Sequence, residues 1–151
     1  MIKRWTLAIG AILVSATFAF ALDGRVERVI DGDTMVIAGK YIRVWGIDSP
    51  ESDQPGGIEA TEFARNILQG KEVHVDEKGT DRYGRLIGEV KVDGADYGTI
   101  MVREGMARCY YQYARGATWL LKAETEASRL KKGIWAIEGQ VPPWEWRRKH
   151  K

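Results

Sequence analysis

Charged and apolar residues meet abruptly in the stretch from Arg43 to Glu51. It reads Arg-Val-Trp-Gly-Ile-Asp-Ser-Pro-Glu, so one guanidinium and two carboxylates lie within nine residues, where an apolar strand should break into a loop. Unpaired charge beside a hydrophobic core is costly. We therefore interpret this stretch as one half of a metal-assisted site that cleaves phosphodiester bonds.

Two other segments carry charge that a purely structural role explains poorly. The first, residues 31–34, reads Asp-Gly-Asp-Thr, and the second, residues 81–85, reads Asp-Arg-Tyr-Gly-Arg. An Asp-Gly pair on its own is usually only a turn. The presence of all three segments in one short chain is what indicates a site.

Hydrolysis of a phosphodiester places growing negative charge on the non-bridging oxygens of the phosphorus centre, which fixed cations must stabilise. Arginine suits this role because its planar guanidinium holds two oxygens at once and stays charged. Arg43 and Arg85 are the candidates. Glu51 is the candidate carboxylate that orients the attacking water or accepts its proton.

A hard divalent cation, held by oxygen ligands alone, could bind the phosphate and position that water. Asp33 and Asp48 provide carboxylates, and the backbone carbonyl of Ser49 is a possible third ligand. Two carboxylates are few for calcium, so we expect weak affinity, with Kd of roughly 10⁻⁴–10⁻³ M. No set of Cys and His residues has zinc-binding spacing.

Strand alternation poses a difficulty for this site. Arg43 and Asp48 are separated by an odd number of residues, so along an ideal strand they would face opposite sides. A bulge at Gly46 could restore the facing, or the strand could end there. The sequence is compatible with both.

The hydrophobic pattern predicts short strands before and after a helix, followed by two later helices. Expected strands cover residues 24–30, 34–38, 41–47, 71–76 and 86–92, and expected helices cover residues 58–68, 96–104 and 117–132. We therefore predict an α+β protein, mainly β, built on a five-stranded OB-type Greek-key barrel with three α-helices.

The N-terminus has the features of a secretory signal peptide. Lys3 and Arg4 precede an uncharged segment from Trp5 to Phe20, which ends in Ala-Phe-Ala at residues 19–21. The alternative is an uncleaved membrane anchor, but the segment is short for one. We expect cleavage after Ala21 and a secreted or periplasmic protein that leaves the membrane after cleavage.

Cleavage would change the charge balance of the chain. Removal of two bases from the total of 23 leaves 21, against 21 acidic residues, so the mature chain would be formally neutral. A globally basic field, typical of a non-specific nucleic-acid binder, is absent. An anionic substrate would then be attracted by local arginines and a metal.

Two other features of the chain bear on partners. Cys109 is the only cysteine, so no internal disulfide can form, and its apolar surroundings favour a buried small hydrophobe over pairing between chains. Residues 137–151 form a tail rich in tryptophan and basic residues. It could stack on a polynucleotide, but we favour tryptophans folded back on the domain with solvated basic residues.

The ordered motifs at residues 29–34, 43–51 and 81–85 resemble those of the staphylococcal nuclease (thermonuclease) family, over roughly residues 24–135. The resemblance implies an OB-type barrel at residues 22–136, calcium-dependent cleavage of DNA and RNA, and 3′-phosphate ends. By position in these motifs, it assigns calcium binding to Asp33, Asp48 and Ser49, catalysis to Arg43, Glu51 and Arg85, and substrate binding to Arg82, Tyr83, Tyr111 and Tyr113.

The chain departs from the best-known member of that family in two ways. The loop at residues 52–57 is short and lacks lysines, and the net charge is neutral after cleavage. The competing interpretation is a catalytically weak or inactive OB-fold module that binds nucleic acid. The presence of every expected carboxylate and arginine favours an enzyme, expected to be a monomer without a stable protein partner.

Overall fold

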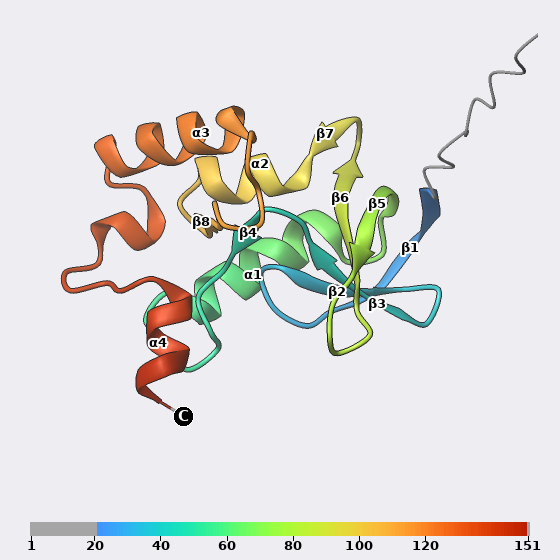
Figure 1. The fold of residues 1–151 in the computed structure, drawn as a ribbon, viewed down its shortest axis with the longest axis horizontal. Helices are drawn as coiled ribbons and strands as arrows, with labels where there is room; N and C mark the ends of the chain where they lie inside the picture. Colours follow the sequence, from blue (N-terminus) through green and yellow to red (C-terminus); the bar gives the residue numbers. More distant parts are fainter. Residues whose placement is uncertain (1–20, 151) are drawn as a thin grey trace, which may run out of the picture.

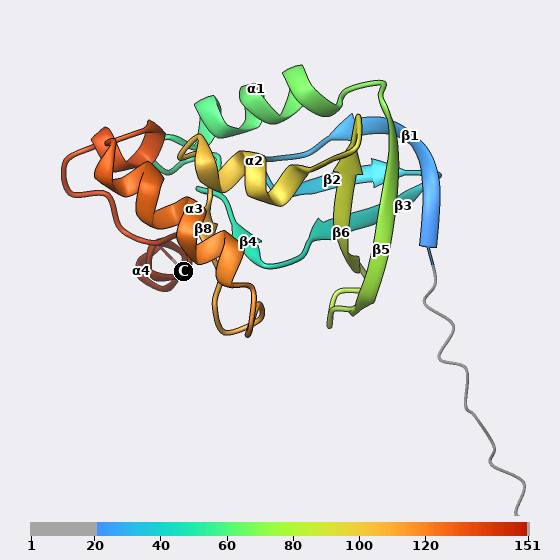
Figure 2. The same cartoon turned by 90° about the horizontal axis from the view of Figure 1, so that it is seen from above.

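The computed structural model describes residues 21–150 of the 151-residue chain. The expected signal peptide therefore lies outside the described residues, except for Ala21. The barrel strands gather at one end of the molecule, and the last two α-helices, α3 (Thr118–Arg129) and α4 (Pro143–Lys149), lie at the other (Figures 1 and 2).

Five strands form a closed barrel, which confirms the predicted OB-type architecture. They are β1 (Ala21–Val29), β2 (Thr34–Ile37), β3 (Lys40–Val44), β5 (Glu72–Thr80) and β6 (Leu86–Val92). Their order is β3-β2-β1-β5-β6, and β6 pairs in parallel with β3 to close the barrel. The short strand β7 (Ala95–Asp96) extends the sheet beyond β6, and β4 (Ile47–Asp48) pairs separately with β8 (Arg108–Cys109).

Local sequence explains the tight connections of the barrel. Ala38 and Gly39 join β2 to β3 with positive φ angles of 48° and 71°, the backbone geometry that short hairpin turns require. The barrel interior is filled by apolar side chains, which alternate with more exposed ones along β5, whereas every residue of β2 is buried. Met35, Ile37 and Ile42, for example, are each 0% exposed.

Within residues 21–150, four α-helices and one 3-10 helix accompany the barrel, one α-helix more than predicted. They are α1 (Gly57–Leu68), α2 (Tyr97–Arg103), α3 (Thr118–Arg129), η1 (Gly133–Ala136) and α4 (Pro143–Lys149). In α1, Ala60, Ala64 and Leu68 are fully buried at helical spacing against the barrel. None of the helices among residues 21–150 is long and apolar enough to cross a membrane.

The additional helix α4 lies in the tail that we expected to be merely folded back. Pro143 occupies its first turn, where a proline costs no helical hydrogen bond. The tail thus has a fixed structure next to the loop that carries Glu51.

Strand β5 extends further than its hydrophobic pattern indicated. Residues 77–80 were expected in a polar connection, but Glu77, Gly79 and Thr80 pair with β6. One face of β5 is exposed to solvent, so the end of the strand cannot be told from a polar loop by its hydrophobic pattern. On that face His74 lies between two carboxylates, with Nδ1 2.6 Å from Asp23 Oδ1 and Nε2 3.2 Å from Asp76 Oδ1.

Cys109 is buried in β8, as its apolar surroundings predicted. Burial, together with the nearby Glu124 carboxylate, raises the pKa of its thiol to about 11. The thiol therefore stays protonated at neutral pH, and its unreactive environment suits a packing role.

Candidate active site

The turn between β1 and β2 presents Asp33 to the site. Asp31 Oδ1 accepts a hydrogen bond from the Asp33 backbone N–H at 3.0 Å, a side-chain interaction typical of Asp in turns. The Tyr97 hydroxyl, at the start of α2, donates to the Gly32 carbonyl at 2.7 Å. Tyr97 is fully buried, so it anchors this turn to the core.

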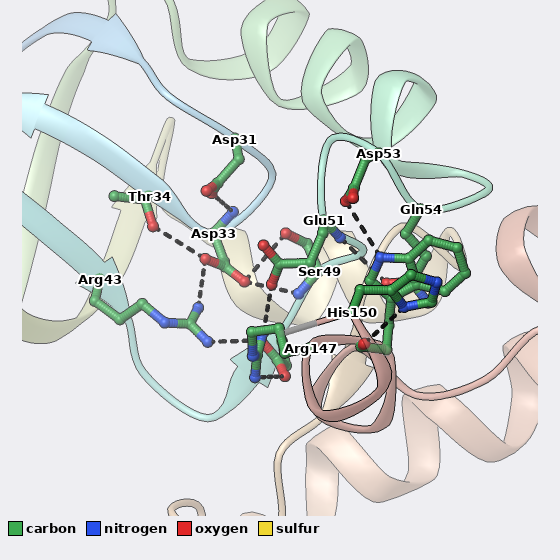
Figure 3. A network of polar contacts seen from close by, with 12 residues as sticks. Asp31, Asp33, Thr34, Arg43, Ser49, Glu51, Asp53, Gln54, Arg147 and His150 are labelled. Carbon is green, nitrogen blue, oxygen red and sulfur yellow. Dashed lines mark hydrogen bonds and ion pairs between the residues drawn. The ribbon is translucent and has the colours of Figure 1, made fainter.

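Arg43 joins the two expected metal-binding carboxylates. Its Nη1 lies 2.6 Å from Asp33 Oδ1, and its Nη2 donates to Asp48 Oδ1 at 2.9 Å (Figure 3). Although Nη1 forms this ion pair, its N–H groups are not aligned with any acceptor among residues 21–150. A buried guanidinium therefore retains donors that a substrate oxygen could use.

The strand break explains how Arg43 and Asp48 come to face each other. Strand β3 ends at Val44, and Gly46 takes a φ of 78° before β4 resumes at Ile47. A Cβ at Gly46 would lie 2.9 Å from a methyl group of Leu120, so glycine is needed for space as well as for φ. The sequence left open whether a bulge forms at Gly46 or the strand ends there, and in the structure the strand ends.

Ser49 orients Asp33 through two hydrogen bonds. Its backbone N–H and its hydroxyl both donate to Asp33 Oδ2, at 2.7 and 3.1 Å. On the other oxygen, Thr34 Oγ1 donates to Asp33 Oδ1 at 3.1 Å. Asp33 is thus held rigidly, while metal ligation by the Ser49 carbonyl stays a prediction.

Burial and neighbouring charges shift the pKa values of Asp31, Asp48 and Arg43. Burial, and then repulsion from Asp33, raises the pKa of Asp31 to about 7. Burial also raises the pKa of Asp48, against the opposing effect of nearby guanidinium groups. For Arg43, burial alone would lower the pKa, but Asp33 and Asp48 outweigh it and raise the pKa. Arg43 is therefore a permanent cation in the site.

Glu51 begins the loop that leads into α1. Its backbone N–H donates to Gln54 Oε1 at 3.2 Å, and its carbonyl accepts from the Gln54 N–H at 2.9 Å. Gly57 packs so closely beneath that any Cβ there would overlap the Glu51 carbonyl. The carboxylate itself is 37% exposed, so water can reach it.

Arg85 reaches the site from the loop between β5 and β6. Its Nε donates to Asp81 Oδ2 at 2.7 Å, and its Nη1 donates to Thr34 Oγ1 at 3.5 Å. Because Thr34 is next to Asp33, the second predicted arginine lies on the same edge of the barrel as the first. The parallel pairing of β3 with β6 brings the two together.

The four residues predicted to bind substrate are all on the surface. Arg82 Nη2 donates to the Tyr83 hydroxyl at 2.6 Å, and Tyr83 is 69% exposed. Tyr111 and Tyr113 are 53% and 64% exposed, and Tyr113 packs on Tyr110 at 4.8 Å between ring centroids. They are available to stack on bases, and their roles stay predictions.

Arg147 of α4 also lies in the site, contrary to the expectation of solvated basic residues in the tail. Its Nη1 and Nη2 donate to the two oxygens of Asp48 at 3.1 and 2.8 Å, and Nη1 donates to Glu51 Oε1 at 2.5 Å. Burial would lower the pKa of Arg147, but the bonds to Asp48 and Glu51 outweigh it and raise the pKa. The only hint in the sequence is the clustering of basic residues there.

The donor set suits a hard divalent cation. Asp33 and Asp48 offer carboxylate oxygens that converge on one side of Arg43. Within residues 21–150, no three His, Cys, Asp or Glu side chains converge as a ready-made metal site. A cation would therefore depend on two carboxylates, completed by backbone oxygen, water or substrate, and Arg147 now covers one of them.

Comparison with known proteins supports the same chemistry. Residues 41–137 match the family model described as staphylococcal nuclease homologue. An uncharacterized endonuclease of Escherichia coli O157:H7 is 39% identical over 83% of this chain and 85% of its own length. A micrococcal nuclease of Shigella flexneri is 34% identical over 96% and 92% of the two chains. An uncharacterized endonuclease of Haemophilus influenzae is 32% identical over 84% and 74%.

Proposed function

Because the chain belongs to the staphylococcal nuclease family and is a nuclease, we propose that it is exported and uses Ca²⁺ to hydrolyse both DNA and RNA. We further propose little sequence specificity and products that end in 3′-phosphate. The observation that carries the proposal is the Arg43 guanidinium, which meets Asp33 and Asp48 while its buried Nη1 keeps unaligned donors.

The two arginines bind and stabilise the reacting phosphate. Arg43 supplies donors that are already desolvated, so they need little rearrangement as charge develops on the phosphate oxygens. Arg85 adds a second guanidinium once a phosphate displaces it from Asp81 and Thr34. When bound at Asp33 and Asp48, a divalent cation would neutralise phosphate charge and lower the pKa of a water molecule.

Glu51 orients the attacking water and takes its proton. It is the exposed carboxylate of the cluster, and its backbone is fixed through Gln54 and the close approach of Gly57. Its exposed side chain is accessible to water, which a general base requires. The tyrosines at residues 83, 111 and 113 offer aromatic faces, and stacking tolerates every base.

The test is incubation of the purified chain with DNA and with RNA in calcium, in magnesium and in chelator. We expect cleavage in calcium, none in chelator, and ends that lose phosphate to a 3′-phosphatase. Glu51→Gln should lower the rate by about 10²–10⁴-fold, because general-base catalysis contributes on that order. Glu126→Gln, on the exposed face of α3, is the matched control and should retain the parent rate.

Three results would contradict the proposal. A Glu51→Gln rate within a few-fold of the parent would exclude Glu51 as the base. Tight, chelator-insensitive binding of single-stranded DNA without product would instead identify a binding module. A secreted form whose mass differs from that of a monomeric chain starting at Leu22 would contradict the proposed export and oligomeric state.

A further inference from the structure

We propose that helix α4 is an autoinhibitory latch, in which Arg147 occupies the carboxylates of Asp48 and Glu51 and must leave before a divalent cation binds. This inference rests on the proposed function, because it concerns regulation of the same site. The inference gives a role to residues 137–151, which have no part in the proposed cleavage of the phosphodiester bond.

The contact of Arg147 with Asp48 uses the lone pairs that a cation would need. Asp48 Oδ2 accepts from Arg147 Nη2 at 2.8 Å, and Oδ1 accepts from both Arg147 Nη1 and Arg43 Nη2. The Asp48 side chain is only 1% exposed, so it has no free approach from solvent. A cation and Arg147 therefore exclude each other at this carboxylate.

Glu51 is blocked by the same guanidinium. Arg147 Nη1 donates to Glu51 Oε1 at 2.5 Å, so one oxygen of the proposed base is paired with a positive charge (Figure 3). The bond occupies Oε1, one of the two oxygens that could accept the proton of the attacking water. Arg147 thus blocks both the metal-binding carboxylate of Asp48 and the proposed base, Glu51.

A small set of contacts holds α4 in place. Trp144 stacks on Tyr110, with ring centroids 5.2 Å apart and ring planes 6° from parallel. Trp146 Nε1 donates to Asp53 Oδ1 at 3.2 Å, and Gln54 Nε2 donates to the Val141 carbonyl at 2.8 Å. Asp53 and Gln54 lie two and three residues after Glu51 in the chain, so the latch is attached to the loop of the base that it blocks.

The latch is weak enough to be released. Helix α4 has seven residues, too few to be a stable helix without its tertiary contacts. Arg147 is 37% exposed, which allows its side chain to exchange the carboxylates for water. A cation that neutralises Asp33 and Asp48 would remove the attraction that keeps Arg147 in the site.

A different role for Arg147, as a third arginine that binds the substrate phosphate, makes the opposite prediction. In that case its removal would lower the rate and leave cation affinity unchanged. The two roles are therefore separated by measuring cation binding directly, in the absence of nucleic acid.

The experiment compares the full chain with Arg147→Ala and with Arg148→Ala, by calorimetric titration with Ca²⁺ alone. Arg148 is the matched control, because within residues 21–150 it forms no ion pair and is next to Arg147 on the same helix. We expect Arg147→Ala to bind Ca²⁺ about tenfold or more tightly than the parent, since it no longer has to break a bidentate charged contact. Arg148→Ala should match the parent.

A second measurement follows the helix itself in the parent. Amide hydrogen exchange of residues 144–149 should become faster when Ca²⁺ is added, and should already be fast in Arg147→Ala. Unchanged exchange on saturation with Ca²⁺ would overturn the latch. So would equal or weaker Ca²⁺ binding by Arg147→Ala.

The outcomes also separate this inference from the proposed function. If Arg147→Ala binds Ca²⁺ more tightly but no variant cleaves nucleic acid, the latch stands and the assigned activity fails. If all variants cleave with the same dependence on Ca²⁺, the activity stands and the latch fails.

Discussion

Removal of the Tyr97 hydroxyl should loosen the turn that carries Asp31 and Asp33. In Tyr97→Phe the ring still fills its buried place in the core, but the Gly32 carbonyl loses its 2.7 Å hydrogen bond. No other change in volume or charge accompanies the substitution. The effect therefore isolates one polar contact between α2 and the β1–β2 turn.

The expected magnitude follows from burial of both partners. Tyr97 is 0% exposed, and a buried acceptor left without its donor costs about 1–3 kcal/mol in the free energy of unfolding. Tyr41→Phe is the matched control, because that tyrosine is 47% exposed and accepts only a 3.3 Å bond from Arg28. The control should cost less than about 0.5 kcal/mol.

Urea unfolding followed by far-ultraviolet circular dichroism measures both variants. Calcium titration should also show weaker binding by Tyr97→Phe, since Gly32 lies between two aspartates of the site. If Tyr97→Phe unfolds within about 0.5 kcal/mol of the parent, like the control, the turn is not anchored as described.

Three further outcomes can be checked with the same methods. Gly57→Ala should destabilise the protein by roughly 1–3 kcal/mol or more and displace Glu51, because the new Cβ would overlap the Glu51 carbonyl. Gly98→Ala is the control and should fold normally, because its Cβ would lie 3.5 Å from the nearest atom. Burial raises the pKa of Asp31 to about 7. In chelator, the stabilising contribution of Asp31 is therefore full below pH 3.8 and is lost as the pH rises through about 7. Asp31→Asn should make the free energy of unfolding depend less on pH across this window. Hydrogen bonds to two aspartates raise the pKa of His74. The contribution of His74 to the free energy of unfolding is therefore full below pH 6.5 and is lost above the raised pKa. In urea unfolding, His74→Gln should destabilise the protein at pH about 6 and less at pH about 9.

Sequence patterns were sufficient where the structural cause is local. The β2–β3 hairpin follows from a turn centred on Gly39, and helix α1 follows from its buried alanines. The sequence placed Asp33 and Arg43 in one site because each belongs to a short motif with its own chemistry. The structure brings them within 2.6 Å.

The remaining features depend on contacts between distant segments, which leave little local signal. Arg147 reaches Asp48 across 99 positions of the chain, and Tyr97 reaches Gly32 across 65. A tyrosine that anchors a turn and one that only fills a core look alike in a hydrophobic pattern. The paired strands β4 and β8 have two residues each, which is below the length at which alternation can be recognised.

The parallel ladder between β3 and β6 has a consequence for when the enzyme becomes active during folding. It pairs Ile42 with Leu86 and Val44 with Gly88, and it is what brings Arg85 toward Arg43. Contacts between distant segments form late, because the entropy of closing the intervening loop must be overcome first. A chain that has formed only the β1–β3 meander holds Asp33 and Arg43 but lacks Asp48 of β4 and the second arginine, Arg85. Recovery of nuclease activity in a refolding experiment therefore reports closure of the barrel, and it should lag behind the recovery of strand signal from the meander.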